Sequence, residues 1–408
     1  MKPLRIVVAG GGAAGFFGAI TSAETNPQAT VILLEKGSHL LAKVRISGGG
    51  RCNVTHACFD LRELSTRYPR GGKVLIGPLT RFGPAETVHW FESRGVKLKT
   101  EPDGRMFPVT DSSQSVIDCL TQAARGAGVK ILPESGVQSI RASDRGGFLL
   151  QLTNGATMEC DRFLWAGGGC RPESHPISAL GHELVSPVPS LFTFHIELPW
   201  IQSLAGLSVP EVEVSVPDLP LKEKGPLLFT HQGLSGPAIL RLSAWGARLL
   251  HDMSYQFPLR INWLPQLSQD EILKEIQTRR VTQGAQMVLR AKWNPLPARL
   301  WEQLAAQAGI TSEDRWSKLS RESGIRLAQT LQATELPVSG KSMNKEEFVT
   351  CGGISLKEVD LKTMESRLVP GLYFAGEALD IDGVTGGFNF QAAWTTGWIA
   401  GQSMAGEG

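Results

Sequence analysis

The chain has 408 residues, of which 42% are hydrophobic and 20% charged, and its net charge is only +2. This length exceeds that of one ordinary domain, and so small a charge does not by itself indicate a nucleic-acid-binding protein. The six cysteines are scattered without a CxxC pair, so we expect neither disulfides nor a metal site, and we predict a cytoplasmic protein. No apolar run approaches the roughly 18 residues that predict a membrane helix.

The N-terminal segment has the pattern of a dinucleotide site. A β-branched run, Arg5–Ala9, precedes the glycine-rich residues 10–15 and then a helix-compatible stretch. This order is typical of a Rossmann turn, in which glycines allow a tight turn and let a pyrophosphate approach the helix N-terminus. A second apolar run, Thr30–Leu34, ends at Glu35, whose carboxylate is placed to accept hydrogen bonds from an adenosine ribose. A carboxylate at this point favours FAD or NAD over NADP.

A glycine-rich segment near the C-terminus favours FAD over NAD. A strand-like run ends at Gly376, and after Asp380 a pair of glycines that ends at Gly387 opens an apolar helical stretch. NAD needs no such element, whereas the flavin and ribityl chain of FAD extend beyond the first site. We expect Asp380 to bind ribityl hydroxyls and the helix start to stabilise negative charge on the reduced flavin. The alternative is that this segment only closes the sheet, which leaves the glycine pair unexplained.

Three further segments are expected to line the cofactor. Residues 161–165 form a strand-like run that ends in glycines, resembling the strand-to-glycine crossing of two-dinucleotide-fold flavoproteins. Residues 129–132, 137–140 and 148–152 are predicted as short strands, with Val137 beside the adenine. The loop at residues 47–53 is rich in glycine, and its backbone N–H groups together with nearby cations would favour an anionic reduced flavin.

Two side chains are candidates for proton transfer. Cys52, in the 47–53 loop, is placed to protonate the substrate carbon opposite the one that receives hydride, and a buried structural role is the alternative. His231 lies in a short loop after an apolar strand, where it faces substrate or has a structural role.

The chain resembles the HI0933-like flavoproteins, a family that includes proteins labelled NAD(P)/FAD-dependent oxidoreductase or aminoacetone oxidase family. Residues 43–55, 228–237 and 350–401 carry the resemblance. It implies an α/β fold with a Rossmann-type FAD-binding domain, residues 1–189 and 345–408, interrupted by an insert. The insert has a β-barrel-like part, residues 190–264 and 330–344, and a helical part, residues 265–329.

The insert shows the same organisation in its own pattern. Residues 192–198, 211–216, 227–229 and 255–261 are strand-like, and a further strand is predicted at residues 332–338. Residues 268–329 show apolar residues at helical spacing, with capping acids after Ser268 and after Ser312.

The residues predicted to bind FAD non-covalently come from all of these segments. They are Gly10, Gly12, Ala13, Ala14, Gly15, Glu35, Lys36, Lys43, Ser47, Gly48, Gly49, Gly50, Arg51, Cys52, Asn53, Val137, Ala166, Gly167, Gly168, Gly376, Glu377, Asp380, Gly386, Gly387, Phe388, Asn389 and Gln391.

These features predict an FAD-dependent oxidoreductase and leave its substrate open. One reading is reduction of an activated C=C bond, in an enone or a uracil ring, with NADH or NADPH as a transient donor. Another is an amine oxidase that passes electrons to oxygen, and a flavin-dependent binding or sensor protein is a third.

RNA is a candidate substrate beside small molecules because two stretches lack acidic residues. The first, residues 276–301, carries Arg279, Arg280, Arg290, Lys292 and Arg299 with Trp293 and Trp301, and the second, residues 64–83, carries Arg67, Arg70, Lys73 and Arg81. Basic residues among aromatics suit phosphate contact and base stacking, and solvated helix faces are the alternative. The family resemblance extends to enzymes that make dihydrouridine in ribosomal RNA.

Overall fold

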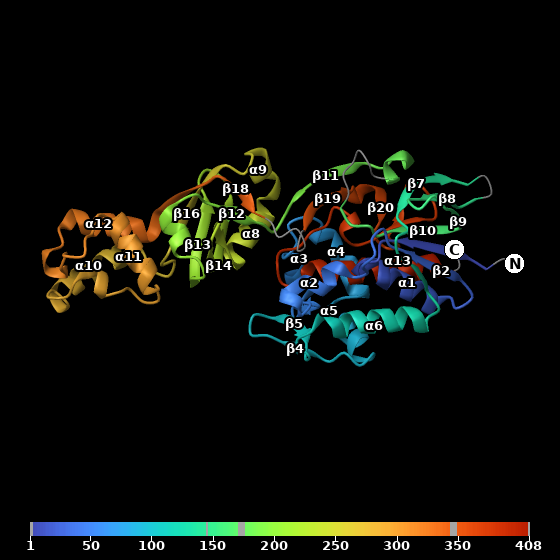
Figure 1. Ribbon diagram of the computed structural model, residues 1–408, viewed down its shortest axis with the longest axis horizontal. Helices are drawn as coiled ribbons and strands as arrows, with labels where there is room; N and C mark the ends of the chain where they lie inside the picture. The colour runs from blue at the N-terminus through green and yellow to red at the C-terminus, as the bar shows by residue number, and fades with distance from the viewer. Residues whose placement is uncertain (1–2, 144–145, 170–175, 343–348, 407–408) are drawn as a thin grey trace. The chain divides into compact units, whose positions relative to one another are not determined.

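The computed structural model describes residues 3–143, 146–169, 176–342 and 349–406, and the chain divides into two compact units (Figure 1). The first unit comprises Met1–Ser190 and Asn344–Gly408, and the second comprises Leu191–Met343. The second unit is therefore an insertion into the sequence of the first. The predicted boundary at residues 344 and 345 lies outside the described residues.

The first unit is built on a sheet with the strand order β20-β21-β22-β10-β1-β2-β6. Strands β22, β10, β1, β2 and β6 run parallel, and β20 and β21 are antiparallel additions at one end. The strands are β1 (Arg5–Ala9), β2 (Thr30–Leu34), β6 (Lys130–Leu132), β10 (Arg162–Trp165), β20 (Val359–Asp360), β21 (Glu365–Ser366) and β22 (Leu372–Phe374). Four of the five residues of β1 are buried, as expected for a parallel strand covered on both faces.

Helices α1 (Ala13–Thr25) and α13 (Phe388–Ala405) lie side by side against this sheet, although they come from opposite ends of the chain (Figure 1). Their backbones approach closely, since a Cβ at Gly397 would lie 2.5 Å from the carbonyl oxygen of Ala14. The fold thus brings the N-terminal and C-terminal glycine segments together.

The remaining elements of the first unit surround this centre. Its other helices are α2 (Ala42–Gly50), α3 (Leu61–Ser65), α4 (Gly72–Arg81), α5 (Pro84–Glu92) and α6 (Ser113–Gly126), with 3-10 turns η2 (Pro176–Leu180), η5 (Leu356–Glu358) and η6 (Gly376–Ala378). Its smaller sheets pair β3 (Thr55–His56), β5 (Arg105–Pro108) and β4 (Leu98–Thr100); β7 (Val137–Ala142), β8 (Phe148–Leu152) and β9 (Thr157–Cys160); and β11 (Leu184–Pro189) with β19 (Thr350–Ile354).

The second unit contains an antiparallel sheet of order β17-β16-β13-β14-β15-β12-β18. Its strands are β12 (Thr193–His195), β13 (Ser208–Val216), β14 (Leu221–Thr230), β15 (Gly233–Ser235), β16 (Phe257–Asn262), β17 (Thr334–Val338) and β18 (Gly340–Ser342). Only Ser339 separates β17 from β18, so one continuous segment of the chain forms both edge strands of the sheet. The sheet therefore curves around a core in which the rings of Phe229 and Trp263 stack with their centres 6.0 Å apart.

Three helices occupy a stretch predicted as strand-like only: α7 (Pro199–Ser203), α8 (Pro237–Trp245) and α9 (Ala247–Asp252). In α8 a proline occupies the first turn, and Ala238, Ile239 and Leu242 are buried at helical spacing. The prediction was wrong here because the neighbouring strands dominated the pattern of the whole stretch.

The helical part of the second unit consists of α10 (Gln269–Thr282), α11 (Ala298–Gln307) and α12 (Arg321–Ala333), with short turns η3 (Val288–Arg290) and η4 (Trp316–Lys318). A capping box of Ser268 and Glu271 starts α10, as expected. The acids after Ser312 start no helix, because Asp314 instead accepts a hydrogen bond from the backbone N–H of Thr311. The predicted strand at 332–338 begins later, since α12 continues to Ala333.

Within the described ranges, every helix is too short or too polar to cross a membrane. The same ranges contain no cluster of three His, Cys, Asp or Glu side chains that could hold a metal ion. Five free cysteines are found there, and all of them are buried.

Candidate functional site

The N-terminus of α1 offers open space above exposed backbone N–H groups. Gly12 is its N-cap residue, and within the described part of the chain no side chain caps it. A Cβ at Gly12 would meet nothing within 4 Å, whereas one at Gly15 would overlap the carbonyl oxygen of Gly10. The positive end of the helix dipole and the free N–H groups suit an anionic pyrophosphate. The local geometry therefore fits the phosphate cradle of a dinucleotide.

Glu35 fixes the loops around this cradle. One carboxylate oxygen accepts a hydrogen bond from Gly11 N at 2.7 Å and the other accepts one from Gly37 N at 2.8 Å. Each oxygen keeps a second lone pair, so the carboxylate still has capacity to accept from a ribose hydroxyl. The start of β7 lies at the same place, since a Cβ at Gly136, directly before Val137, would be 2.8 Å from Cβ of the exposed Lys36.

The 47–53 loop has an unusual backbone. Gly48, Gly49 and Gly50 have φ of 58°, 69° and 83°, and Cys52 has φ of 62°. This left-handed run breaks α2 and turns the chain toward the start of α13. There the amide oxygen of Asn53, in the orientation that satisfies its surroundings, accepts a hydrogen bond from Gly387 N at 2.9 Å.

The third glycine segment lies beside the first. Gly10 packs so closely on the carbonyl of Ala166 that a Cβ would overlap it. A Cβ at Gly168 would be 4.0 Å from the carboxylate of Glu377, which belongs to the C-terminal segment. The segments predicted to bind FAD therefore converge at one end of the parallel sheet, although the contact of each residue with FAD stays a prediction.

Two cations near the 47–53 loop, Lys43 and Arg51, are paired with acids, and whether they face the flavin stays a prediction. Lys43 contacts Glu377 at 2.5 Å, and its side chain is 51% exposed. Arg51 contacts Glu101 at 2.6 Å and lies 4.0 Å from the ring centre of Phe107. The hydrogen bond to Glu101 raises the pKa of the Arg51 guanidinium. Its positive charge is therefore largely compensated within the protein.

The C-terminal loop, residues 376–387, is held by side chains that the sequence suggested for FAD. One oxygen of Asp380 accepts a hydrogen bond from Gly352 N at 3.0 Å. Asn389 bonds both the N–H and the carbonyl of Gly383. The fully buried Gln391 accepts a hydrogen bond from Thr55 at 2.6 Å. These side chains shape the loop, so what the helix start offers a ligand is its backbone N–H groups.

Aromatic side chains also pack at the point where the C-terminal loop enters α13. Phe388 is buried and stacks on His56 with ring centres 4.8 Å apart. Burial lowers the pKa of His56, so the imidazole is neutral at physiological pH.

The two candidate proton donors have different surroundings. Cys52 is 0% exposed, and burial raises the pKa of its thiol to about 12, so the thiol stays protonated. His231 is exposed in the two-residue turn between β14 and β15, which belongs to the second unit. Cys52 needs a local rearrangement to reach a substrate, and the catalytic role of both residues stays a prediction.

One ion pair, formed by a residue of the C-terminal loop at 376–387, was not predicted from the sequence. Asp382 is fully buried and accepts hydrogen bonds from Arg70 and from Ser190. In the sequence, Arg70 is only one of several cations in an acid-free stretch. Its partner lies more than 300 positions along the chain, so neither the acid-free stretch nor a local spacing could reveal the pair.

The basic and aromatic stretch of the helical part is mainly internal packing. Trp293, Trp301 and Trp316 are 3%, 0% and 0% exposed, so they are not platforms for stacked bases. Arg279 lies over Trp293 at 4.5 Å and pairs with Glu275 at 2.8 Å. The expectation that Trp293 and Trp301 stack on RNA was wrong, because both side chains are buried in the hydrophobic core of the second unit.

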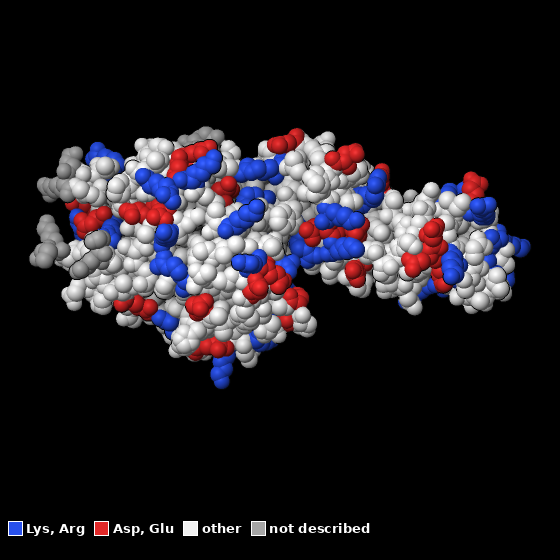
Figure 2. Space-filling model, turned by 180° about the vertical axis from the view of Figure 1, so that it is seen from behind, with Lys and Arg blue, Asp and Glu red and all other residues white. Residues whose placement is uncertain are grey.

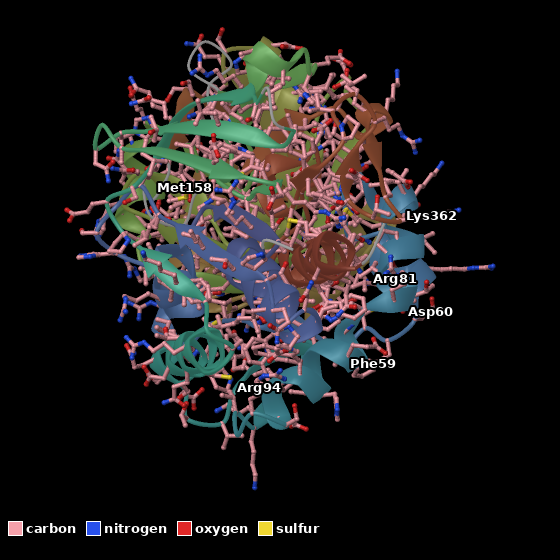
Figure 3. The ribbon with its side chains drawn as sticks, turned by 90° about the vertical axis from the view of Figure 1, so that its right-hand side faces the viewer. Phe59, Asp60, Arg81, Arg94, Met158 and Lys362 are labelled. Carbon is pink, nitrogen blue, oxygen red and sulfur yellow. The ribbon has the colours of Figure 1, made fainter. Side chains whose placement is uncertain are left out.

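Charges elsewhere are mixed. Figure 2 shows Lys and Arg side chains interspersed with Asp and Glu side chains over both units on the face in view. In the second acid-free stretch, Arg67 pairs with Glu63 at 2.9 Å, and Arg81 donates to the carbonyl of the neighbouring Lys362 (Figure 3).

This site is typical of a Rossmann-type flavoprotein, because it combines a parallel sheet, converging glycine loops and helix N-termini at Gly12 and Gly387. Comparison with known proteins identifies the chain as an FAD-dependent oxidoreductase. Residues 4–403 match the model of the HI0933-like protein Rossmann domain, which covers nearly the whole chain. The chain belongs to that family.

Its relatives include enzymes with two kinds of substrate. The chain is 31% identical to the ribosomal RNA dihydrouridine synthase of Escherichia coli, over 99% of this chain and 98% of the relative. It is 27% identical to the 3-dehydro-bile acid delta(4,6)-reductase of Clostridium scindens, over 98% of this chain and 99% of the relative. A 3-ketosteroid-delta4-(5alpha)-dehydrogenase from Rhodococcus jostii shares the fold, with a TM-score of 0.52 and 15% identity over 100% of this chain and 98% of the other.

Proposed function

We propose that this protein reduces a carbon–carbon double bond conjugated to a carbonyl group, that its substrate is a uridine of ribosomal RNA, and that NADH or NADPH is the electron donor. The observation that carries the proposal is the full-length match, 31% identical, to a ribosomal RNA dihydrouridine synthase. The match to a delta(4,6)-reductase supports the same bond chemistry, because both names describe the loss of a ring double bond.

The chain's own residues would have three tasks. The helix N-termini at Gly12 and Gly387 would bind the pyrophosphate and the pyrimidine edge of FAD through backbone N–H groups. FAD, once bound and reduced, supplies the hydride. A side chain must then protonate the second carbon. The neutral thiol of Cys52 and the exposed imidazole of His231 stay the candidates.

RNA binding would need cations that the fold leaves available. Arg290 and Lys292, in the helical part, are exposed, and Arg280 is partly exposed. Exposed cations of this kind contact phosphates without reading sequence. The proposed RNA contact therefore rests on exposed cations such as these, and not on the buried tryptophans.

A small-molecule enone is the second candidate substrate, favoured by the 27% identity to the bile acid reductase. An amine oxidase that uses oxygen is the remaining alternative. The two reductase candidates share the direction of electron flow and differ in the acceptor, whereas the oxidase reverses the flow at the substrate.

The test begins with purified protein loaded with FAD and mixed anaerobically with NADH or NADPH. We expect the flavin absorbance to bleach and reoxidation by air to be slow. Addition of ribosomal RNA that lacks dihydrouridine should restore the absorbance and yield dihydrouridine, detected by mass spectrometry of the digested RNA. Rapid turnover of a 3-oxo-4,6-diene steroid with no RNA product would support the second candidate. Bleaching by aminoacetone with fast recovery in oxygen would refute the reductase proposal.

A further inference from the structure

A pocket of about 390 Å³ lies in the first unit between the end of α4, helix α5 and the middle of α13. Aromatic and basic side chains line it together. Trp90 and Trp398 contribute indole rings, and Arg81 and Arg94, both labelled in Figure 3, contribute guanidinium groups. None of these four residues belongs to the set predicted to bind FAD, so the pocket calls for a ligand or a role of its own.

Trp398 is the residue that α13 presents to this pocket. Every other residue from 391 to 401 is buried, whereas Trp398 is partly exposed. Buried indoles usually donate their N–H to an acceptor, as Trp394 does to the carbonyl of Val54 at 2.9 Å. The indole N–H of Trp398 donates to none of the residues that the structure describes. Trp398 therefore combines accessible ring surface with an unused donor.

Two neighbours hold this indole in place. Phe82, which is 4% exposed, stacks on it with ring centres 5.3 Å apart and planes inclined by 24°. The guanidinium of Arg81 lies 5.7 Å from the indole centre, and Arg81 also donates to the carbonyl of Lys362. Among the described residues, no carboxylate pairs with Arg81, and its side chain is exposed. An uncompensated positive charge therefore lies next to the indole.

The other charged groups of the pocket are already engaged within the protein. Arg94 pairs with Glu24 at 2.8 Å, and its guanidinium lies 4.1 Å from the ring centre of Trp90. Glu86 caps the start of α5, where it accepts a hydrogen bond from Gly83 N at 2.9 Å. Arg81 is thus the cation of this pocket that is available to an anionic group of a ligand.

We propose that this pocket binds one nucleotide of an RNA substrate, with the base stacked on Trp398 and the adjoining phosphate paired with Arg81. The inference rests on the proposed reduction of an RNA uridine. Single-stranded RNA is commonly held by an aromatic side chain that stacks on a base and by a nearby cation that binds the backbone. Such stacking tolerates any base, because every base has a π-face.

The position along α13 favours a polymer over a nicotinamide dinucleotide. Trp398 follows Phe388 by ten residues, which is roughly 15 Å along the helix axis. A base bound here is therefore not the one that meets a flavin at Gly387. A nicotinamide has to lie at the flavin itself, whereas an RNA strand extends from the reduced uridine to a second contact. The pocket would hold a nucleotide at a distance from the reacting one.

The test measures the affinity of FAD-loaded protein for labelled ribosomal RNA that lacks dihydrouridine, by filter binding over a range of salt concentrations. Trp398→Leu removes the stacking surface and should weaken binding roughly five- to hundredfold, with an unchanged slope of log affinity against log salt. Trp398→Phe keeps a ring and should retain most of the affinity. Arg81→Met should lower the slope by about 0.7, the value for one lost phosphate contact on a single strand.

Arg67→Met and Trp245→Leu are the matched controls. Arg67 is an exposed cation of the same acid-free stretch whose charge is met by Glu63, and Trp245 is a 41% exposed indole of the second unit. Neither change should alter the affinity or the slope. Flavin content equal to wild type shows that a variant is folded. If Trp398→Leu loses its flavin, Arg81→Met, at an exposed position, still decides.

Several results would overturn the inference while the proposed function stands, provided that wild type forms dihydrouridine. These are equal losses in Trp398→Leu and Trp398→Phe, equal losses in the controls, or wild-type binding in both Trp398→Leu and Arg81→Met. Normal RNA binding with slower flavin reduction by NADPH would assign the pocket to the electron donor instead. Wild-type protein that binds RNA through these residues and forms no dihydrouridine would contradict the proposed function alone, and a wild type that binds no RNA would overturn both.

Discussion

Gly12→Val is expected to separate FAD binding from folding. At this position φ is −94° and ψ is −168°, which a side chain adopts without strain, and a Cβ would meet nothing within 4 Å. The added side chain would instead occupy the space above the helix N-terminus that a pyrophosphate needs. The apoprotein should therefore fold, and it should fail to bind FAD.

The magnitudes follow from the position. A change at an uncapped N-cap glycine costs roughly 0.5–1 kcal/mol, which is about 1–4 °C in the melting temperature of a unit of this size. Saturating FAD, at about 100 times its dissociation constant, should stabilise the wild-type protein by about 2.7 kcal/mol. Gly15→Ala is the contrasting variant, because its Cβ would overlap the carbonyl oxygen of Gly10. Such overpacking costs roughly 1–3 kcal/mol in the apoprotein itself.

The assay is thermal unfolding of each apoprotein with and without FAD, together with FAD titration followed by flavin fluorescence. Wild type should gain stability with FAD, Gly12→Val should gain none, and Gly15→Ala should already melt low without FAD. The reasoning is refuted if Gly12→Val keeps the FAD-dependent gain, or if its apoprotein is destabilised as much as that of Gly15→Ala.

Three further outcomes are expected. Arg280→Glu with Arg290→Glu should lower the slope of log RNA affinity against log salt by roughly 0.7–0.9 per lost phosphate contact, while flavin content stays unchanged; an unaltered slope in filter-binding assays would exclude this contact. Burial raises the pKa of the Cys52 thiol from 9.0 to about 12. The contribution of the neutral thiol to the free energy of unfolding should therefore be complete below pH 9 and decline as pH rises toward 12. In urea unfolding across that range, the difference in free energy of unfolding between wild type and Cys52→Ala should narrow. His231→Asn should slow substrate reduction without changing flavin reduction by the nicotinamide, and stopped-flow rates that are equal to wild type in both steps would remove His231 from the mechanism.

The parts of the site that depend on short local patterns were predictable from sequence. Strands β1 and β2, the glycine turn at Gly12 and the carboxylate at Glu35 lie within about 30 residues of one another, and each follows from the geometry of a single turn. The role of the C-terminal glycine pair at the start of a helix was also predictable, because a strand, a glycine loop and a helix follow one another without interruption. Their convergence in space needed the fold, which pairs β10 with β1 and packs α13 on α1.

The charges of the site were not predictable, because each depends on a partner remote in sequence. Lys43 pairs with Glu377, and Asp382 pairs with Arg70. A list of cations near a glycine loop suggests a positive site, whereas the folded chain compensates the charges of Lys43 and Arg51. The electrostatics around the site therefore depend on how these charges pair in the fold, which a count of charges does not give.

The Arg and Trp interleaving in the helical part shows why one pattern fitted two explanations. The helical part packs large indoles into the same hydrophobic core as the sheet of the second unit, where each buries much apolar surface. Trp301 and Trp316 lie within it, and Arg279 covers Trp293 with its guanidinium while its charge is met by Glu275. The same letters would describe stacked bases on an open surface. Burial separates the two, so RNA binding by the helical part would have to use exposed cations such as Arg290 and Lys292, and charge reversal at Arg279 would test packing and not RNA contact.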